Sequence, residues 1–84
     1  MKYENTSTLI SEWRSLNKLG QKALALKLGY RSAQFISNIE RGLCLLPVKK
    51  FNKLSRVLGL DLELIKTAYI ADISEEINRV IYKR

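Results

Sequence analysis

The stretch that decides the fold is residues 21–42, QKALALKLGYRSAQFISNIERG. Its apolar residues recur at helical spacing in two short runs: Leu24, Ala25 and Leu28, then Ile36 and Ile39. A glycine follows each run, as is typical where a helix ends. The pattern predicts one helix over about 21–28 and a second over about 33–41, with Ser32 as the N-cap of the second.

The second of these helices would expose a row of polar side chains opposite its apolar face: Gln34, Ser37, Asn38 and Arg41. A short helix of this kind, placed after a tight turn, is the layout of a helix-turn-helix that enters the DNA major groove. Gln and Asn suit bidentate pairing with adenine, and Arg suits guanine or phosphate. Any surface helix also shows polar residues outward, so the pattern alone leaves both interpretations open.

Helical spacing continues on both sides of this stretch. Before it, a helix over about 7–18 carries three apolar residues on one face, Leu9, Trp13 and Leu16, and the polar cluster at 5–8 would supply its N-cap. After it, the only proline, Pro47, suits the first turn of another helix. That helix would stop at Gly59 and bury four apolar residues: Val48, Phe51, Leu54 and Leu58.

The rest of the chain is also predicted to be helical. Asp61 would cap a fifth helix, which either continues to the end of the chain or is followed by a sixth helix within 70–84. Strand-like alternation of apolar and polar residues is absent. We therefore predict an all-α fold of five or six helices, with a helix-turn-helix domain over 1–69 and a helical extension over 70–84.

The charge distribution favours a polyanionic partner. The chain has 15 Lys and Arg against 8 Asp and Glu, a net charge of +7. Residues 1–60 hold 11 basic and 3 acidic side chains, whereas residues 61–84 hold 4 and 5. A positive field concentrates nucleic acid near the surface that carries it. A merely solubilising surface would have the same sign, so charge does not decide between the two.

Composition argues against several other classes. The chain has one cysteine, Cys44, and no histidine, so it lacks an internal disulfide, a Cys/His zinc cluster and the commonest general base. We expect no enzyme activity, no metal and no cofactor. No apolar run suggests a signal peptide in the first seven residues or a membrane-spanning segment elsewhere. These features predict a protein of a reducing cytoplasm without a membrane partner.

Taken in order, residues 9–66 resemble the Cro/C1-type helix-turn-helix family, also called the XRE family. The matched spacings are Gln21, Leu24-Ala25 and Leu28-Gly29 in the first helix of the motif, then Ser37, Ile39-Glu40 and Gly42 at the close of the second. The resemblance implies a compact lambda-repressor-like domain. It also implies a sequence-specific transcriptional regulator, a repressor that binds double-stranded DNA as a homodimer.

The resemblance assigns roles to individual residues. Gln21 would contact a phosphate and brace the recognition helix. Three residues would face base edges in the major groove: Ala33, through a thymine methyl, and Gln34 and Asn38, through hydrogen bonds. Lys49 and Lys50 would lie near the DNA backbone. Glu40 falls near the inner face, where a bare carboxylate is costly, and the resemblance pairs it with Arg14.

The chain departs from the family pattern at two places. The segment 29–37 is one residue longer than usual, and the extra residue falls within 30–32. This places Arg31 and Ser32 in the turn, where both join the DNA-binding candidates. The loop at 43–46, Leu-Cys-Leu-Leu, is apolar where many relatives are polar. It would either plug the core or form a protein contact surface.

The last segment carries an apolar stripe at helical spacing: Ile73, Ile77, Val80 and Ile81. We expect this stripe to form a homodimer interface, although it could instead pack back on its own domain. A second functional class also remains open, in which the chain is an antitoxin or another protein-binding module that holds a protein partner and binds DNA as well.

Overall fold

The structure is a computed structural model that describes residues 2–83, and over those residues it contains helices and no strand. The elements in order are α1 (Glu4–Leu16), α2 (Gln21–Lys27), α3 (Gln34–Glu40), the short 3-10 helix η1 (Val48–Lys50), α4 (Phe51–Leu58) and α5 (Leu62–Ile81). The predicted all-α fold class is confirmed. Within residues 2–83, α5 runs without interruption through residue 70, where the helical extension was predicted to begin, so no separate sixth helix is formed. The predicted division into 1–69 and 70–84 includes residues 1 and 84, which lie outside the described residues.

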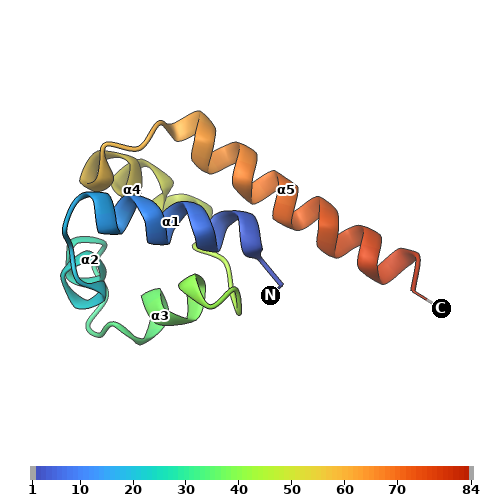
Figure 1. Cartoon of the computed structure of the whole chain (residues 1–84), viewed down its shortest axis with the longest axis horizontal. Coiled ribbons are helices and arrows are strands. Elements are labelled where there is room, and N and C mark those ends of the chain that lie inside the picture. The colour runs from blue at the N-terminus through green and yellow to red at the C-terminus, as the bar shows by residue number, and fades with distance from the viewer. Residues whose placement is uncertain (1, 84) are drawn as a thin grey trace.

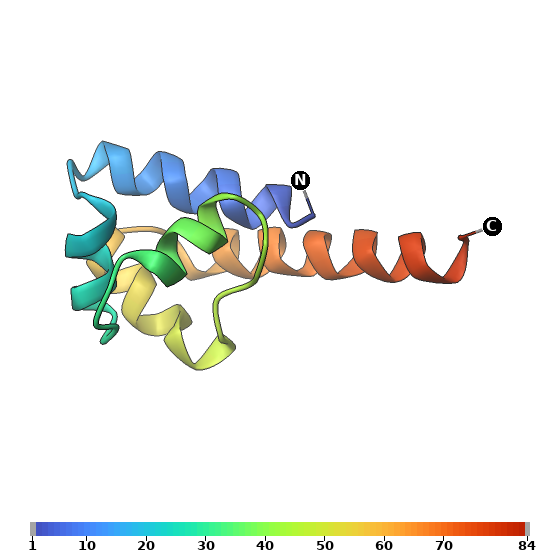
Figure 2. The same cartoon turned by 90° about the horizontal axis from the view of Figure 1, so that it is seen from below.

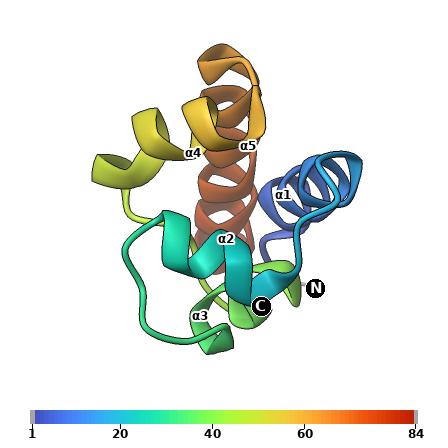
Figure 3. The same ribbon diagram turned by 90° about the vertical axis from the view of Figure 1, so that its left-hand side faces the viewer.

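The core lies where α1, α2, α3, α4 and the first half of α5 converge (Figures 1 and 3). Its fully buried members come from every α-helix and from the loop before η1: Ile10, Leu24, Ala25, Leu28, Ile36, Ile39, Leu46, Leu54, Leu58, Leu60 and Ile65. Each large side chain of this kind contributes about 1.5–3 kcal/mol when it leaves water. The inner faces of α2 and α3 are thus anchored in the core.

The start of α1 differs from the prediction. The helix begins at Glu4, so the polar cluster at 5–8 lies inside it and does not act as the N-cap. The free N–H groups of Asn5 and Thr6 donate instead to the two carboxylate oxygens of Asp72, at 2.9 and 2.8 Å. Asp72 belongs to α5 and is fully buried. A helix N-terminus attracts negative charge, so a side chain 66 residues away in sequence supplies the cap.

Two apolar residues that were predicted to face the core are exposed. Leu16, at the last position of α1, is 71% exposed, and the deeply buried residue of that helix is Ile10. Val48 is 61% exposed because Pro47 stands outside the helix and η1 winds with three residues per turn. This tighter winding rotates Val48 away from the face that Leu54 and Leu58 bury in α4.

Helix α5 joins the body and then leaves it. Asp61 caps its start as predicted, accepting a hydrogen bond from the N–H of Glu63 at 2.9 Å. The first half packs against α1 and α4, whereas the second half extends beyond the other helices (Figures 1 and 2). No helix between residues 2 and 83 is both long enough and apolar enough to cross a membrane.

Candidate nucleic-acid interface

One carboxylate fixes α3 to its neighbours. Glu40 accepts hydrogen bonds from Nε and Nη2 of Arg14 at 2.6 and 3.0 Å, and from Nε2 of Gln21 at 3.0 Å. The ion pair proposed for Arg14 and Glu40 is therefore formed, with side chains only 17% and 8% exposed. The hydrogen bond to Glu40 raises the pKa of the Arg14 guanidinium. We call these three residues the Glu40 network; it joins α1, α2 and α3.

Backbone contacts reinforce this attachment at the C-terminal end of α3. The hydroxyl of Ser7 donates to the carbonyl of Glu40 at 2.6 Å, and the N–H of Tyr3 donates to the carbonyl of Gly42 at 3.2 Å. These bonds satisfy carbonyls that a helix end leaves without a partner. Helix α3 is therefore held at its C-terminal end by Ser7 and Tyr3, and its outer face remains exposed.

The outer face of α3 carries a connected row of polar side chains. Nε2 of Gln34 donates to Oδ1 of Asn38 at 3.0 Å, and Nη2 of Arg41 donates to the same oxygen at 2.7 Å. The three residues are four and three positions apart, so they lie along one face of the helix. The amide N–H groups of Asn38 and the amide oxygen of Gln34 are left to pair with an external partner.

The turn that carries the extra residue is packed. Gly29 has φ 93°, which places it in the conformation that favours glycine. The rings of Tyr30 and Phe35 lie 4.9 Å apart. Lys50 donates to the carbonyl of Leu28 at 2.8 Å, and its ammonium lies 5.1 Å from the centre of the Tyr30 ring. Phe35 therefore packs against the turn, and Lys50 is engaged within the protein rather than extended toward a backbone phosphate.

The remaining candidates surround α3. Arg31 and Ser32 are exposed in the turn, and the hydroxyl of Ser32 accepts from the N–H of Gln34 at 3.4 Å. Ala33 and Ser37 are half-buried, Arg41 is exposed, and Lys49 is exposed in η1. Gln21 is half-buried and its amide is used by Glu40. Figure 2, seen from below, shows α3 in front of the other helices.

The apolar loop at 43–46 mostly fills the core. Leu46 is buried, Cys44 and Leu45 are half-buried, and only Leu43 is exposed. Burial raises the pKa of the Cys44 thiol, and burial together with Cys44 raises the pKa of the Tyr30 hydroxyl. The hydroxyl of Tyr30 is buried without a hydrogen-bond partner. Leu46 thus belongs to the core, and Cys44 packs against it.

The apolar stripe of α5 is uncovered over most of its length. Ile73 is half-buried, whereas Ile77, Val80 and Ile81 are exposed, so the stripe does not pack back on its own domain. Ile70, which shares this spacing but was not among the predicted dimer residues, is also exposed. A shallow hollow runs along it, lined in part by Ile70, Ile73 and Ile77. We call these five residues the isoleucine stripe.

Sequence analysis also missed Ser7 and Asp72, which position α1 and α3, because no local pattern marks a hydrogen bond between residues so far apart. Within residues 2–83, no three His, Cys, Asp or Glu side chains gather where a metal ion could be held. No family model matches the chain, and neither the curated proteins nor the solved structures contain a significant match.

Proposed function

We propose that the chain is a sequence-specific double-stranded DNA-binding regulator that reads the major groove with α3. The observation that carries the proposal is the row of Gln34, Asn38 and Arg41 on the outer face of a short helix whose inner face is locked by the Glu40 network. A reader of base edges needs polar side chains that are held in register, and this arrangement provides them.

In this proposal some residues of the interface contact bases, others contact phosphates, and others position α3. Gln34 and Asn38 pair with bases, Arg41 pairs with guanine or phosphate, and the small side chains of Ala33 and Ser37 allow close approach to the bases. The exposed cations Arg31 and Lys49, with Ser32, contact phosphates and set the register. Gln21 and Lys50 act mainly by positioning, because their polar groups are already bonded to Glu40 and to the Leu28 carbonyl.

We further propose that the protein acts as a homodimer through the isoleucine stripe. Ile77 is 52% exposed and Ile81 is 61% exposed, and the contact of this apolar surface with water is unfavourable. A second copy would remove that contact by covering the same residues. Dimeric readers of this class bind two half-sites about one helical turn apart. A dimer that occupies a promoter in this way would act as a repressor.

The alternative function, an antitoxin or another protein-binding module, is favoured by the same stripe if its partner is a different chain. The homodimer and the protein-binding module predict different oligomeric states for the purified protein. A truncation after Ile73 keeps Asp72 and removes most of the stripe. Sedimentation should show a dimer for the full chain and a monomer for the truncation; a full chain that remains monomeric would favour a different protein as the partner.

Base reading is tested with Gln34→Ala and Asn38→Ala. Each should lose about 1–3 kcal/mol of discrimination between the preferred duplex and an unrelated one, while affinity for the unrelated duplex stays unchanged. Affinity should fall with salt at a logarithmic slope of about −0.9 per phosphate neutralised. Glu63→Ala, in an exposed residue of α5, serves as the matched control. Full preference in both variants would contradict the assigned register of α3.

A further inference from the structure

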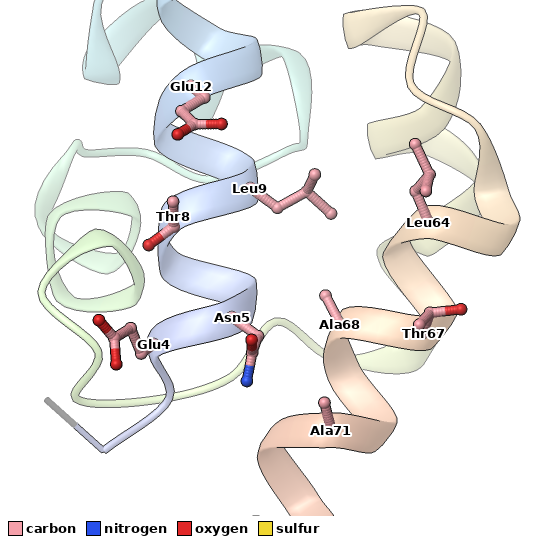
Figure 4. A pocket seen from close by; sticks show the side chains of 9 residues that line it. All are labelled: Glu4, Asn5, Thr8, Leu9, Glu12, Leu64, Thr67, Ala68 and Ala71. Atoms are coloured by element: carbon pink, nitrogen blue, oxygen red, sulfur yellow. The ribbon is translucent and has the colours of Figure 1, made fainter.

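A groove separates α1 from the first half of α5 (Figure 4). It encloses about 480 Å³ and opens to solvent along its length. Its walls are formed by nine residues of the two helices: Glu4, Asn5, Thr8, Leu9, Glu12, Leu64, Thr67, Ala68 and Ala71. In Figure 4, Leu9 points toward α5, whereas Glu4 and Thr8 point away from it. Thr8 and Glu12 also line a second hollow with Glu40 of α3, but the groove includes none of Gln34, Asn38 and Arg41 on the outer face of α3.

The charge of the groove is opposite to that of the protein as a whole. Five of the eight acidic residues are engaged elsewhere: Glu40, Glu63 and Glu76 in ion pairs, and Asp61 and Asp72 in helix caps. The other three have no ion pair among residues 2–83. Two of them, Glu4 and Glu12, line the groove, and no Lys or Arg does so in a chain that has 15.

Of these three carboxylates, only Glu12 has no evident structural role among residues 2–83. Glu4 lies in the first turn of α1, where a negative charge stabilises the helix N-terminus. Glu12 lies two turns further along, outside the reach of that effect. Glu75 lies four residues after Ala71, on the groove side of α5, and its closest polar contact is a 3.4 Å hydrogen bond from the Asn5 amide. Glu4 and Glu12 thus form an acidic edge on the α1 side of the groove, and Glu75 lies beyond its lining.

The floor of the groove is apolar and built partly from small side chains. Leu9 is half-buried and Leu64 is 48% exposed, while Ala68 and Ala71 leave space for a backbone to approach closely. The exposed Leu16, seven residues after Leu9, extends the apolar face along α1. A channel between two helices, with a narrow apolar floor and charged edges, fits a third helix that has one apolar face.

The isoleucine stripe of a second copy does not fit this groove in a two-fold dimer. Ala68 faces the groove, whereas Ile77 belongs to the isoleucine stripe. The two residues are nine positions apart, or two and a half helical turns, so their side chains point in opposite directions. Groove and stripe therefore lie on opposite faces of one straight helix. In a two-fold dimer, the α5 of the second copy would have to lie on the groove side of the first copy's α5 at one end and on its stripe side at the other end. Two straight helices cannot do this without passing through each other.

We propose that the α1–α5 groove binds a basic amphipathic helix of another protein. Lys or Arg side chains of that helix pair with Glu4 and Glu12, and its apolar face covers Leu9 and Leu64. Because α3 and the isoleucine stripe lie on other faces, the bound helix excludes neither DNA nor a second copy. The inference therefore does not depend on DNA binding, and it adds a recruited protein to the proposed regulator.

The probe is a fluorescein-labelled synthetic helix of about 14 residues, which matches the roughly 20 Å length of α1 at 1.5 Å per residue. It carries Leu at positions 1, 5, 8 and 12 of the peptide and Lys beside them; a matched peptide carries Glu in place of Lys. Fluorescence anisotropy without DNA should show binding of the Lys peptide alone. Amide shifts in NMR spectra should map to residues that line the groove, including Thr8 and Ala68.

Two charge reversals locate the interaction. Glu12→Lys should weaken binding of the Lys peptide roughly tenfold. Glu63→Lys changes net charge equally but lies outside the groove and should bind like the parent; circular dichroism verifies that both variants fold. Equal binding of the two peptides, equal loss in both variants, or shifts confined to the isoleucine stripe would overturn the proposal. Conversion of a dimer to a monomer by Glu12→Lys would also overturn it, because the occupant would then be a second copy.

Discussion

Isoleucines recur at helical spacing in both α3 and the second half of α5, but the two helices place them differently. In α3, Ile36 and Ile39 are each 1% exposed, and the end of the helix is fixed by Arg14, Gln21 and Ser7. In α5, Ile77 and Ile81 are mostly exposed, and the helix extends beyond the body. The same local pattern thus gives a core in one region and an uncovered face in the other.

The difference shows that spacing determines which residues share a face, whereas other segments determine whether that face is covered. Helix α3 is short, and α1 and α2 pack against it; it has little stability of its own and depends on those contacts. Helix α5 has 20 residues and continues as a helix where nothing in the monomer covers it. The body therefore carries the buried core, and the second half of α5 carries an exposed apolar face.

The largest expected difference between the two regions is in core substitutions. Ile39→Ala should lower the free energy of unfolding by about 2–5 kcal/mol, because it leaves a cavity. Ile77→Ala should change it by less than about 0.5 kcal/mol in the monomer. Urea denaturation at a concentration too low for self-association measures both. If Ile39→Ala does not fold, Ile39→Val should cost about 0.5–1.5 kcal/mol. Equal costs at the two positions would remove the distinction between body and tail.

The next largest effect is expected in the Glu40 network. Glu40→Ala leaves the partly buried guanidinium of Arg14 without its partner and should cost roughly 3 kcal/mol. Glu63→Ala removes an exposed ion pair with Lys66 and should cost at most about 0.5 kcal/mol. Chemical denaturation compares the two. A Glu40→Ala variant as stable as the parent would mean that α3 is held by its apolar face alone.

Asp72 marks the boundary between body and tail. Asp72→Ala removes the acceptor for the N–H groups of Asn5 and Thr6 and should cost about 1.5–3 kcal/mol. In a domain of this size, each kcal/mol lowers Tm by roughly 4–8 °C. Glu75→Ala, three residues along α5, is the control and should leave Tm nearly unchanged. An unchanged Tm for Asp72→Ala would show that the cap contributes nothing to the attachment of α5.

The smallest effect concerns thiol chemistry in the two regions. Burial raises the pKa of Cys44, so at a given pH less thiolate is present and alkylation is slower than for a free thiol. Ser74→Cys, combined with Cys44→Ser, places the only thiol on the exposed tail and should react faster. The rate for Cys44 should rise with pH to a midpoint above that of the tail thiol. A midpoint at or below it would contradict the burial of Cys44.

Local patterns were sufficient for much of the fold. The positions of α2 and α3 and the cap at Asp61 agree with the structure to within a residue or two. The pairing of Arg14 with Glu40 is also formed, but the family resemblance implied it and no local pattern did. The start of α1 could not be predicted, because its cap is supplied by Asp72 from the other end of the chain. The exposure of Leu16 was likewise unpredictable, since it depends on which helices pack beside the end of α1.

The candidate site was predictable in composition but not in its internal bonding. The polar face of α3 follows from the spacing of Gln34, Asn38 and Arg41 against the buried isoleucines. Lys50 was expected beside DNA, but its ammonium bonds to the carbonyl of Leu28, because the turn before α3 brings that carbonyl close to η1. The sequence shows that Lys50 is positively charged, whereas the group that its ammonium contacts depends on how segments distant in sequence pack together.

The proposed division between a reading body and a dimerising tail is tested most directly by selection of bound sequences from a random pool of duplexes. The account predicts strong enrichment of a two-fold symmetric sequence, with half-sites about 34–36 Å apart or a multiple of that distance. The truncation after Ile73 should enrich only a single half-site. Failure to enrich any sequence at low salt would contradict the account, because the outer face of α3 would then not be a reader of DNA.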